Sequence, residues 1–81
     1  MAIIGTGIDA AEIERVRAAL EHATIGARFK ARVYTLNEQR YCDGRGSGRW
    51  ESYAVRFAAK EATMKALGLG WGGRIGWLDV E

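Results

Sequence analysis

The most informative part of the chain runs Arg56-Phe-Ala-Ala-Lys-Glu-Ala-Thr-Met-Lys65. At 3.6 residues per turn, Glu61 and Lys65 project from nearly the same side of a helix, and Arg56 and Lys60 share an adjacent side. A carboxylate is a hard oxygen ligand for an ion such as magnesium, and the neighbouring cations suit phosphate. Taken alone, the stretch favours a plainer interpretation, because Glu-x-x-x-Lys is an ordinary solvent-facing ion pair worth about 0.3–0.5 kcal/mol.

A second carboxylate lies near the N-terminus. The apolar run at residues 2–8 is rich in β-branched side chains and predicts a buried strand, followed by a segment with the pattern of a capping box. Asp9 is therefore a candidate helix N-cap. Gly5 and Gly7 would also permit close backbone approach beside it, and an acid at a strand end with an acid on a helix makes a two-carboxylate magnesium site. Asp9 and Glu61 are the candidate metal ligands.

Three segments carry a family resemblance. Gly5-Thr-Gly-Ile-Asp9 with Glu12-Ile-Glu-Arg15 matches a Gly-x-Gly-x-Asp, Glu-x-x-Arg motif, and Arg56 through Gly70 matches a second, longer motif without departure. Between them, Phe29 through Glu38 is similar to a Phe-x-x-Arg, Thr-x-x-Glu segment. In this order the motifs resemble the holo-acyl-carrier-protein synthase family, the group I 4′-phosphopantetheinyl transferases.

The resemblance implies an α+β fold of the 4′-phosphopantetheinyl transferase type, with a small antiparallel or mixed sheet packed against helices. Residues 1–81 would form one domain, the N-terminal two thirds of that fold. Family members continue beyond Glu81 through a strand, a helix, a Ser-x-Ser-His segment and closing strands. If these 81 residues were the whole product, we would expect exposed apolar surface, binding of a hydrophobic dye, and no transferase activity unless the missing segment were supplied in trans.

The activity implied is transfer of 4′-phosphopantetheine from coenzyme A to a serine of acyl carrier protein, releasing 3′,5′-ADP, in fatty acid biosynthesis. Asp9 and Glu61 would bind Mg²⁺. Coenzyme A would be bound by residues of the long motif, namely Arg56, Lys60, Lys65 and Gly68. Glu61 and Lys65 would be catalytic, with Lys65 also assisting the leaving group. The general base would be a metal-bound water or a carboxylate.

Arg15 would contact the acidic helix of the carrier protein. Its alternative role is a surface ion pair with Glu12 or Glu14. A second functional hypothesis follows from the missing closing segment: a module that docks acyl carrier protein without turnover.

Charge is unevenly distributed along the chain. The net charge is only +2, but residues 28–56 hold seven cations against three acids. The cations are Arg28, Lys30, Arg32, Arg40, Arg45, Arg49 and Arg56. A basic surface of this kind could bind nucleic acid, could be an ordinary solvent-exposed face, or could attract an acidic carrier protein and the phosphates of coenzyme A. With the resemblance, we expect the last of these and no nucleic acid.

Composition excludes several other classes. Cys42 is the single cysteine, which rules out an internal disulfide. Together with His22, the single histidine, it makes too few ligands for a zinc site. We expect no membrane span and no signal peptide, hence a cytoplasmic protein, and the family is commonly homotrimeric.

Gly5 to Ala10 also fits a dinucleotide fingerprint, but Asp9 would place a negative charge beside the pyrophosphate.

The element order expected from local patterns is strand, helices, strand. The full series is a strand at 2–8, a helix at about 10–23 ending near Gly26, a short helix after the N-cap Thr35, a loop at 43–48, a helix from about 50 to 67 with a left-handed cap at Gly68–Gly70, a turn at 71–74, and a strand at 75–80.

Overall fold

A computed structural model of the chain describes residues 3–4, 8–68 and 76–80. Its element order is β1, β2, four α-helices with a short 3₁₀ turn before the last, and a final 3₁₀ turn, η2. The expected backbone approach at Gly5 and Gly7, the cap at residues 69–70 and the turn at 71–74 lie outside the described residues.

The N-terminal segment is a short ribbon and not the single strand predicted for 2–8. β1 (Ile3–Ile4) and β2 (Ile8–Asp9) pair antiparallel, with Ile3 opposite Asp9 and Ile4 opposite Ile8. Among the described residues this ribbon is the only sheet, and the larger sheet expected from the resemblance is not confirmed. The described part of the chain is mainly helical.

Asp9 caps the first helix, as predicted. α1 spans Ala10–Glu21, and the Asp9 carboxylate accepts a hydrogen bond from the backbone N–H of Glu12 at 2.8 Å. The helix is two residues shorter than expected, ending before His22.

A helix that the sequence analysis missed follows it. α2 spans Gly26–Val33, although Gly26 was expected to end the preceding helix. Gly26 is buried, and a Cβ there would collide with the carbonyl oxygen of Leu20. Glycine is therefore required by the close approach of α2 to the end of α1, and it does not act as a helix stop.

The next two helices follow the predicted signals. α3 (Leu36–Asp43) begins with a complete capping box, in which Thr35 Oγ1 accepts from the N–H of Glu38 and the Glu38 carboxylate accepts from the N–H of Thr35 at 2.9 Å. The predicted loop contains the 3₁₀ turn η1 (Gly46–Gly48), where Gly46 has a positive φ of 61°. α4 (Arg49–Gly68) is the long motif helix.

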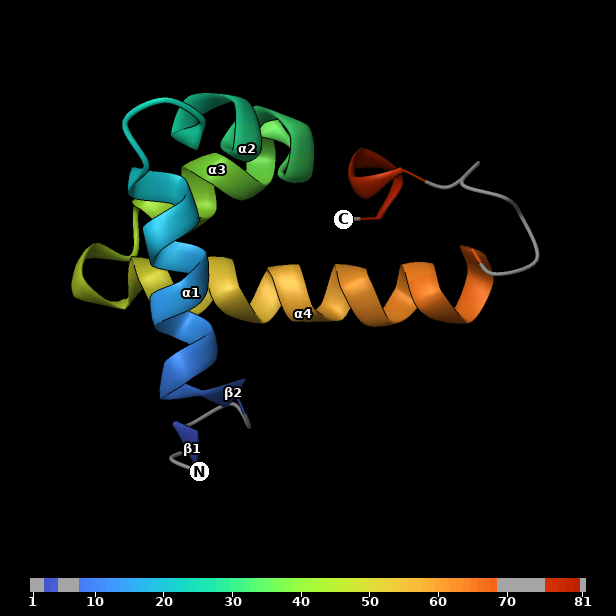
Figure 1. The fold of residues 1–81 in the computed structure, drawn as a ribbon, viewed down its shortest axis with the longest axis horizontal. Helices are drawn as coiled ribbons and strands as arrows, with labels where there is room; N and C mark the ends of the chain where they lie inside the picture. The colour runs from blue at the N-terminus through green and yellow to red at the C-terminus, as the bar shows by residue number, and fades with distance from the viewer. Residues whose placement is uncertain (1–2, 5–7, 69–75, 81) are drawn as a thin grey trace.

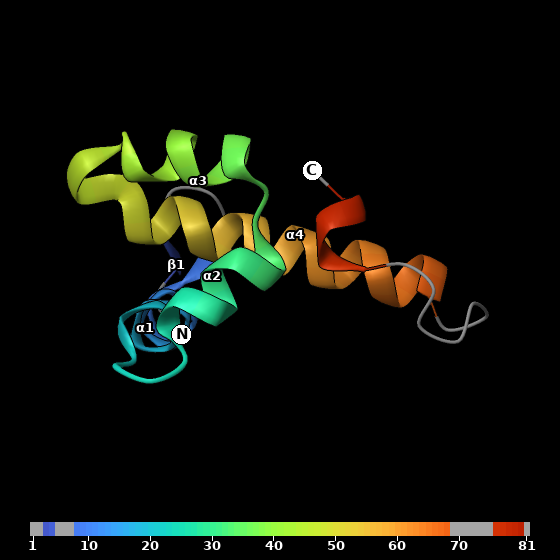
Figure 2. The same ribbon diagram turned by 90° about the horizontal axis from the view of Figure 1, so that it is seen from above.

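Where the structure describes it, at residues 76–80, the C-terminal segment is a turn and not part of the predicted strand. η2 (Trp77–Asp79) lies beside α4 (Figures 1 and 2). The Trp77 ring stacks on Phe57 of that helix, with ring centroids 5.1 Å apart. The carbonyl oxygens of Trp77 and Val80 accept hydrogen bonds from Lys60, so these groups are satisfied by a side chain in place of a neighbouring strand.

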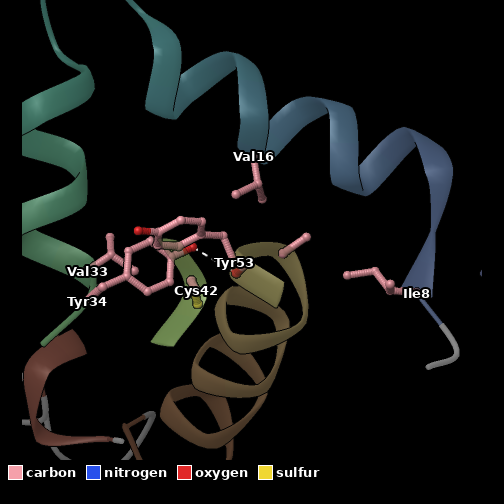
Figure 3. Packing of buried hydrophobic residues seen from close by; sticks show 7 residues of the cluster. Ile8, Val16, Val33, Tyr34, Cys42 and Tyr53 are labelled. Atoms are coloured by element: carbon pink, nitrogen blue, oxygen red, sulfur yellow. Dashed lines mark hydrogen bonds between the residues drawn. The ribbon is translucent and has the colours of Figure 1, made fainter. Parts of the chain in front are cut away.

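The core lies where α1 crosses α4 and extends toward α2 and α3 (Figure 3). Tyr34 and Tyr53 are its largest aromatic members, with ring centroids 4.8 Å apart. The Tyr34 hydroxyl donates to the backbone carbonyl of Tyr53 at 2.8 Å, and the Tyr53 hydroxyl donates to Asp43 at 2.7 Å. Burial raises the pKa of both tyrosines, so both hydroxyls remain protonated donors into the alkaline range.

Candidate active site

α4 distributes the predicted site residues over different sides of the molecule. Lys60 is turned inward and only 2% exposed, Glu61 is partly buried, and Lys65 is exposed. Gly68 is the last residue of the helix. The helical spacing that the sequence indicated is therefore present, while the burial of Lys60 comes from packing against α3 and η2.

Lys60 forms a buried ion pair with Glu38 of α3. The ammonium nitrogen lies 2.7 Å from Glu38 Oε1, and the Glu38 side chain is 3% exposed. The same ammonium donates to the carbonyl oxygens of Trp77, at 2.7 Å, and Val80. A lysine has three N–H donors, so these three acceptors use all of them.

Arg56 lies one helical turn before Lys60 and faces a pocket. Its guanidinium carbon is 4.7 Å from the centre of the Tyr41 ring, and its Nη1 is 3.9 Å from Glu38 Oε2. The pocket has a volume of about 270 Å³ and is bordered by Arg45 and Glu51 as well. Among the described residues, Arg56 Nε and Glu51 Oε2 are the buried side-chain atoms without a hydrogen-bond partner. Both atoms are buried, so neither is itself open to a ligand, and the cationic lining of the pocket comes from Arg45 and Arg56 as residues.

The two candidate metal ligands belong to elements that contact one another. Asp9 closes β2, and β2 packs on α4, the helix of Glu61. The described residues contain no cluster of three or more metal-binding side chains. The donor set still fits magnesium, because that ion is commonly held by one or two carboxylates and completes its octahedron with water and substrate phosphate.

Glu61 and Arg15 border one small pocket. Its volume is about 250 Å³ and its apolar wall includes Phe29 and Phe57. Arg15 has a highly exposed side chain (71%) and pairs with Glu12 at 2.6 Å, so the ion pair considered as its alternative role is present. An exposed pair of this kind holds Arg15 weakly and leaves it accessible to a partner.

Glu38 is the site residue that sequence reasoning did not assign. It was noted above only as the last residue of the Thr-x-x-Glu segment. A glutamate at that helical position is explained by the cap alone, so nothing local indicates its second role beside Lys60 and Arg56. That role requires the packing of α3 on α4.

A helical unit with buried ion pairs and a cation-lined pocket defines no chemistry by itself, but its sequence does define a family. The family model described as 4′-phosphopantetheinyl transferase superfamily matches residues 5–81, and the chain belongs to that superfamily. The predicted resemblance is thereby confirmed.

Named relatives make the similarity more specific. The chain is 46% identical to a holo-acyl-carrier-protein synthase of Solibacter usitatus, covering 98% of this chain and 61% of the relative. For proteins of the same name the identity is 50% in Protochlamydia amoebophila (96% and 62% covered) and 44% in Ruminiclostridium cellulolyticum (93% and 54% covered). The chain thus spans little more than half the length of these relatives. No solved structure matched the chain.

Proposed function

We propose that the protein acts in the transfer of 4′-phosphopantetheine from coenzyme A to a serine of apo-acyl carrier protein, giving holo-acyl carrier protein and 3′,5′-ADP. The single observation that carries this proposal is the family match over residues 5–81, which includes the whole of α4. Relatives named for this activity support it.

The reaction is a displacement at the β-phosphorus of coenzyme A. The serine oxygen forms a new bond to phosphorus, the bond to the oxygen of 3′,5′-ADP breaks, and the serine proton passes to a base. The site must therefore bind the pyrophosphate, align the serine and neutralise negative charge. A magnesium ion held by Asp9 and Glu61 would supply charge neutralisation at the pyrophosphate.

The described side chains suit these tasks to different degrees. Arg56 borders a pocket that Arg45 also lines, and this pair of cations supports a role in phosphate binding. Lys65 is exposed and so able to reach a phosphate and the leaving group. Lys60 would have to exchange one of its present acceptors to do the same. We assign Gly68 to coenzyme A binding from the motif alone.

Carrier-protein docking would use Arg15 and the pocket that it shares with Glu61. The geometry supports this because the exposed cation and the candidate metal ligand border the same apolar wall. An acidic helix held by Arg15 would therefore lie close to the carboxylate where transfer takes place.

Assembly and location are proposed on the resemblance. A homotrimer is supported by large apolar side chains left exposed, among them Leu36 at 69% and Leu78 at 50%. Within the described part of the chain, no helix has the length and hydropathy needed to cross a bilayer. We propose a cytoplasmic protein, in keeping with a reaction between coenzyme A and a carrier protein.

A second candidate function is docking without turnover. It is favoured by one observation, the exposed Arg15 beside a pocket with an apolar wall, since binding a carrier there needs no metal site. Mass spectrometry of apo-acyl carrier protein incubated with the protein, coenzyme A and Mg²⁺ separates the two. A mass gain of one phosphopantetheine supports the transferase, whereas binding of the carrier without a mass gain supports the docking module.

A further inference from the structure

Glu38 is a buried acid with two oxygens directed at different partners. Its Oε1 accepts from Lys60 at 2.7 Å and from the backbone N–H of Thr35 at 2.9 Å. Its Oε2 lies 3.9 Å from Arg56 Nη1. One carboxylate thus contacts two cations of α4.

Stability alone does not account for this arrangement. Burying an ion pair carries a large desolvation penalty, and apolar residues of similar volume in its place are often as stable or more so. A buried acid that faces two cations of a candidate site is therefore better explained by what it holds in place.

The two cations differ in what remains open to a ligand. All three donors of Lys60 are used, and two of its acceptors are carbonyls of the C-terminal segment. The Arg56 guanidinium lies over the Tyr41 ring, has Glu38 near one end, and belongs to a residue that borders the pocket described above. A guanidinium that two neighbours position at the edge of a pocket suits bidentate phosphate binding.

We propose that Glu38 is a positioning residue for phosphate binding: it orients Arg56 toward its pocket and holds Lys60 as the anchor of the C-terminal turn. Lys60 then serves to attach Trp77 and Val80 to α4, and Arg56 makes the phosphate contact. This inference rests on the proposed function, since it takes coenzyme A as the ligand.

The test compares coenzyme A affinity, by calorimetry, in four proteins and one matched control. The first is the unchanged protein, and the second is the neutral-pair variant, which carries both Glu38→Gln and Lys60→Met. The third carries Arg56→Gln alone, and the fourth, the triple variant, carries all three substitutions. Glutamine keeps the capping box, and removing both charges leaves no unpaired buried ion, so the neutral-pair variant is expected to fold. Circular dichroism checks the fold of each protein.

We expect the neutral-pair variant and Arg56→Gln each to bind coenzyme A about tenfold more weakly, the factor typical of one lost charge-assisted hydrogen bond. We expect the triple variant to be no weaker than either, because Glu38 acts through Arg56 and their effects are not additive. The matched control is Arg17→Gln with Glu21→Gln. It also removes one cation and one acid, from an exposed pair at 3.1 Å, and should leave the affinity unchanged.

Two results would overturn this inference while leaving the proposed function standing. Unchanged affinity in the neutral-pair variant would show that Glu38 does not orient Arg56. Multiplied losses in the triple variant would show that Lys60 contacts phosphate independently. No binding by the unchanged protein would instead refute the proposed function, and the inference with it. As a readout without ligand, the Arg56 Nε–H signal in NMR should shift in the neutral-pair variant but not in the control, and an unshifted signal would also count against the inference.

Discussion

Replacing Lys60 with methionine should destabilise the protein strongly. The substitution keeps a long unbranched side chain but removes the ammonium that lies 2.7 Å from Glu38 Oε1. Glu38 would remain buried, with Arg56 at 3.9 Å as its remaining ion-pair partner among the described residues. The carbonyl oxygens of Trp77 and Val80 would lose the donor that they share.

The expected size follows from this geometry. Removing one partner of a buried ion pair typically costs about 3–5 kcal/mol, because the other charge is left uncompensated. Arg56 can partly compensate Glu38, so the lower end applies, about 3 kcal/mol. For a chain of this size each kcal/mol lowers Tm by roughly 4–8 °C, which gives a decrease of roughly 12–24 °C.

Thermal and urea unfolding followed by far-ultraviolet circular dichroism measures the effect. Lys65→Met is the matched control, since Lys65 is an exposed lysine of the same helix, and it should change the free energy of unfolding by less than about 0.5 kcal/mol. Adding Glu38→Gln to Lys60→Met should restore most of the loss by removing the stranded charge. A loss below about 1 kcal/mol for Lys60→Met, or no recovery in the double variant, would refute this reasoning.

Four further predictions concern single residues. Glu61→Gln should abolish most magnesium-dependent transfer in an active form of the enzyme while Tm stays unchanged, and near-normal turnover at low magnesium would remove Glu61 as a metal ligand. Arg15→Glu should raise KM for acyl carrier protein but not for coenzyme A, with an effect that shrinks as salt increases; an unchanged carrier KM at low salt would leave Arg15 as a surface ion pair. Thr35→Ala should lower the free energy of unfolding by about 1 kcal/mol and Thr35→Ser by much less, as urea titration would show, and equal losses would exclude the cap as the cause. The pKa of Asp43 is lowered mainly by the hydrogen bond from Tyr53, so the contribution of Asp43 to the free energy of unfolding is complete above the unfolded pKa of about 3.9 and is lost as pH falls below it. Asp43→Asn should therefore weaken the loss of stability at acid pH, and urea titrations that show the same loss in both proteins would contradict this.

The sequence determined the features that depend on neighbours along the chain. Asp9 and Thr35 were predicted as N-caps because a cap needs only its own side chain and a backbone N–H three residues on, and both hydrogen bonds are present. The long helix followed from its own periodicity, and the motif within it identified the superfamily. The assignments of Asp9, Glu61 and Lys65 to metal and phosphate remain predictions.

The tertiary structure decided the features that depend on distant neighbours. Gly26 reads locally as a helix end, yet its lack of a side chain serves the contact with the Leu20 carbonyl, and α2 begins there. The alternating pattern that ends at Val80 predicts a strand, but in the described part the carbonyl oxygens of Trp77 and Val80 accept hydrogen bonds from Lys60. Glu38 has the same sequence signature whether or not it meets a cation, and only the packing of α3 against α4 places its carboxylate beside Lys60 and excludes water from both. Burial is a property of the assembled chain, so the partners of a buried charge cannot be determined from the residues beside it in sequence.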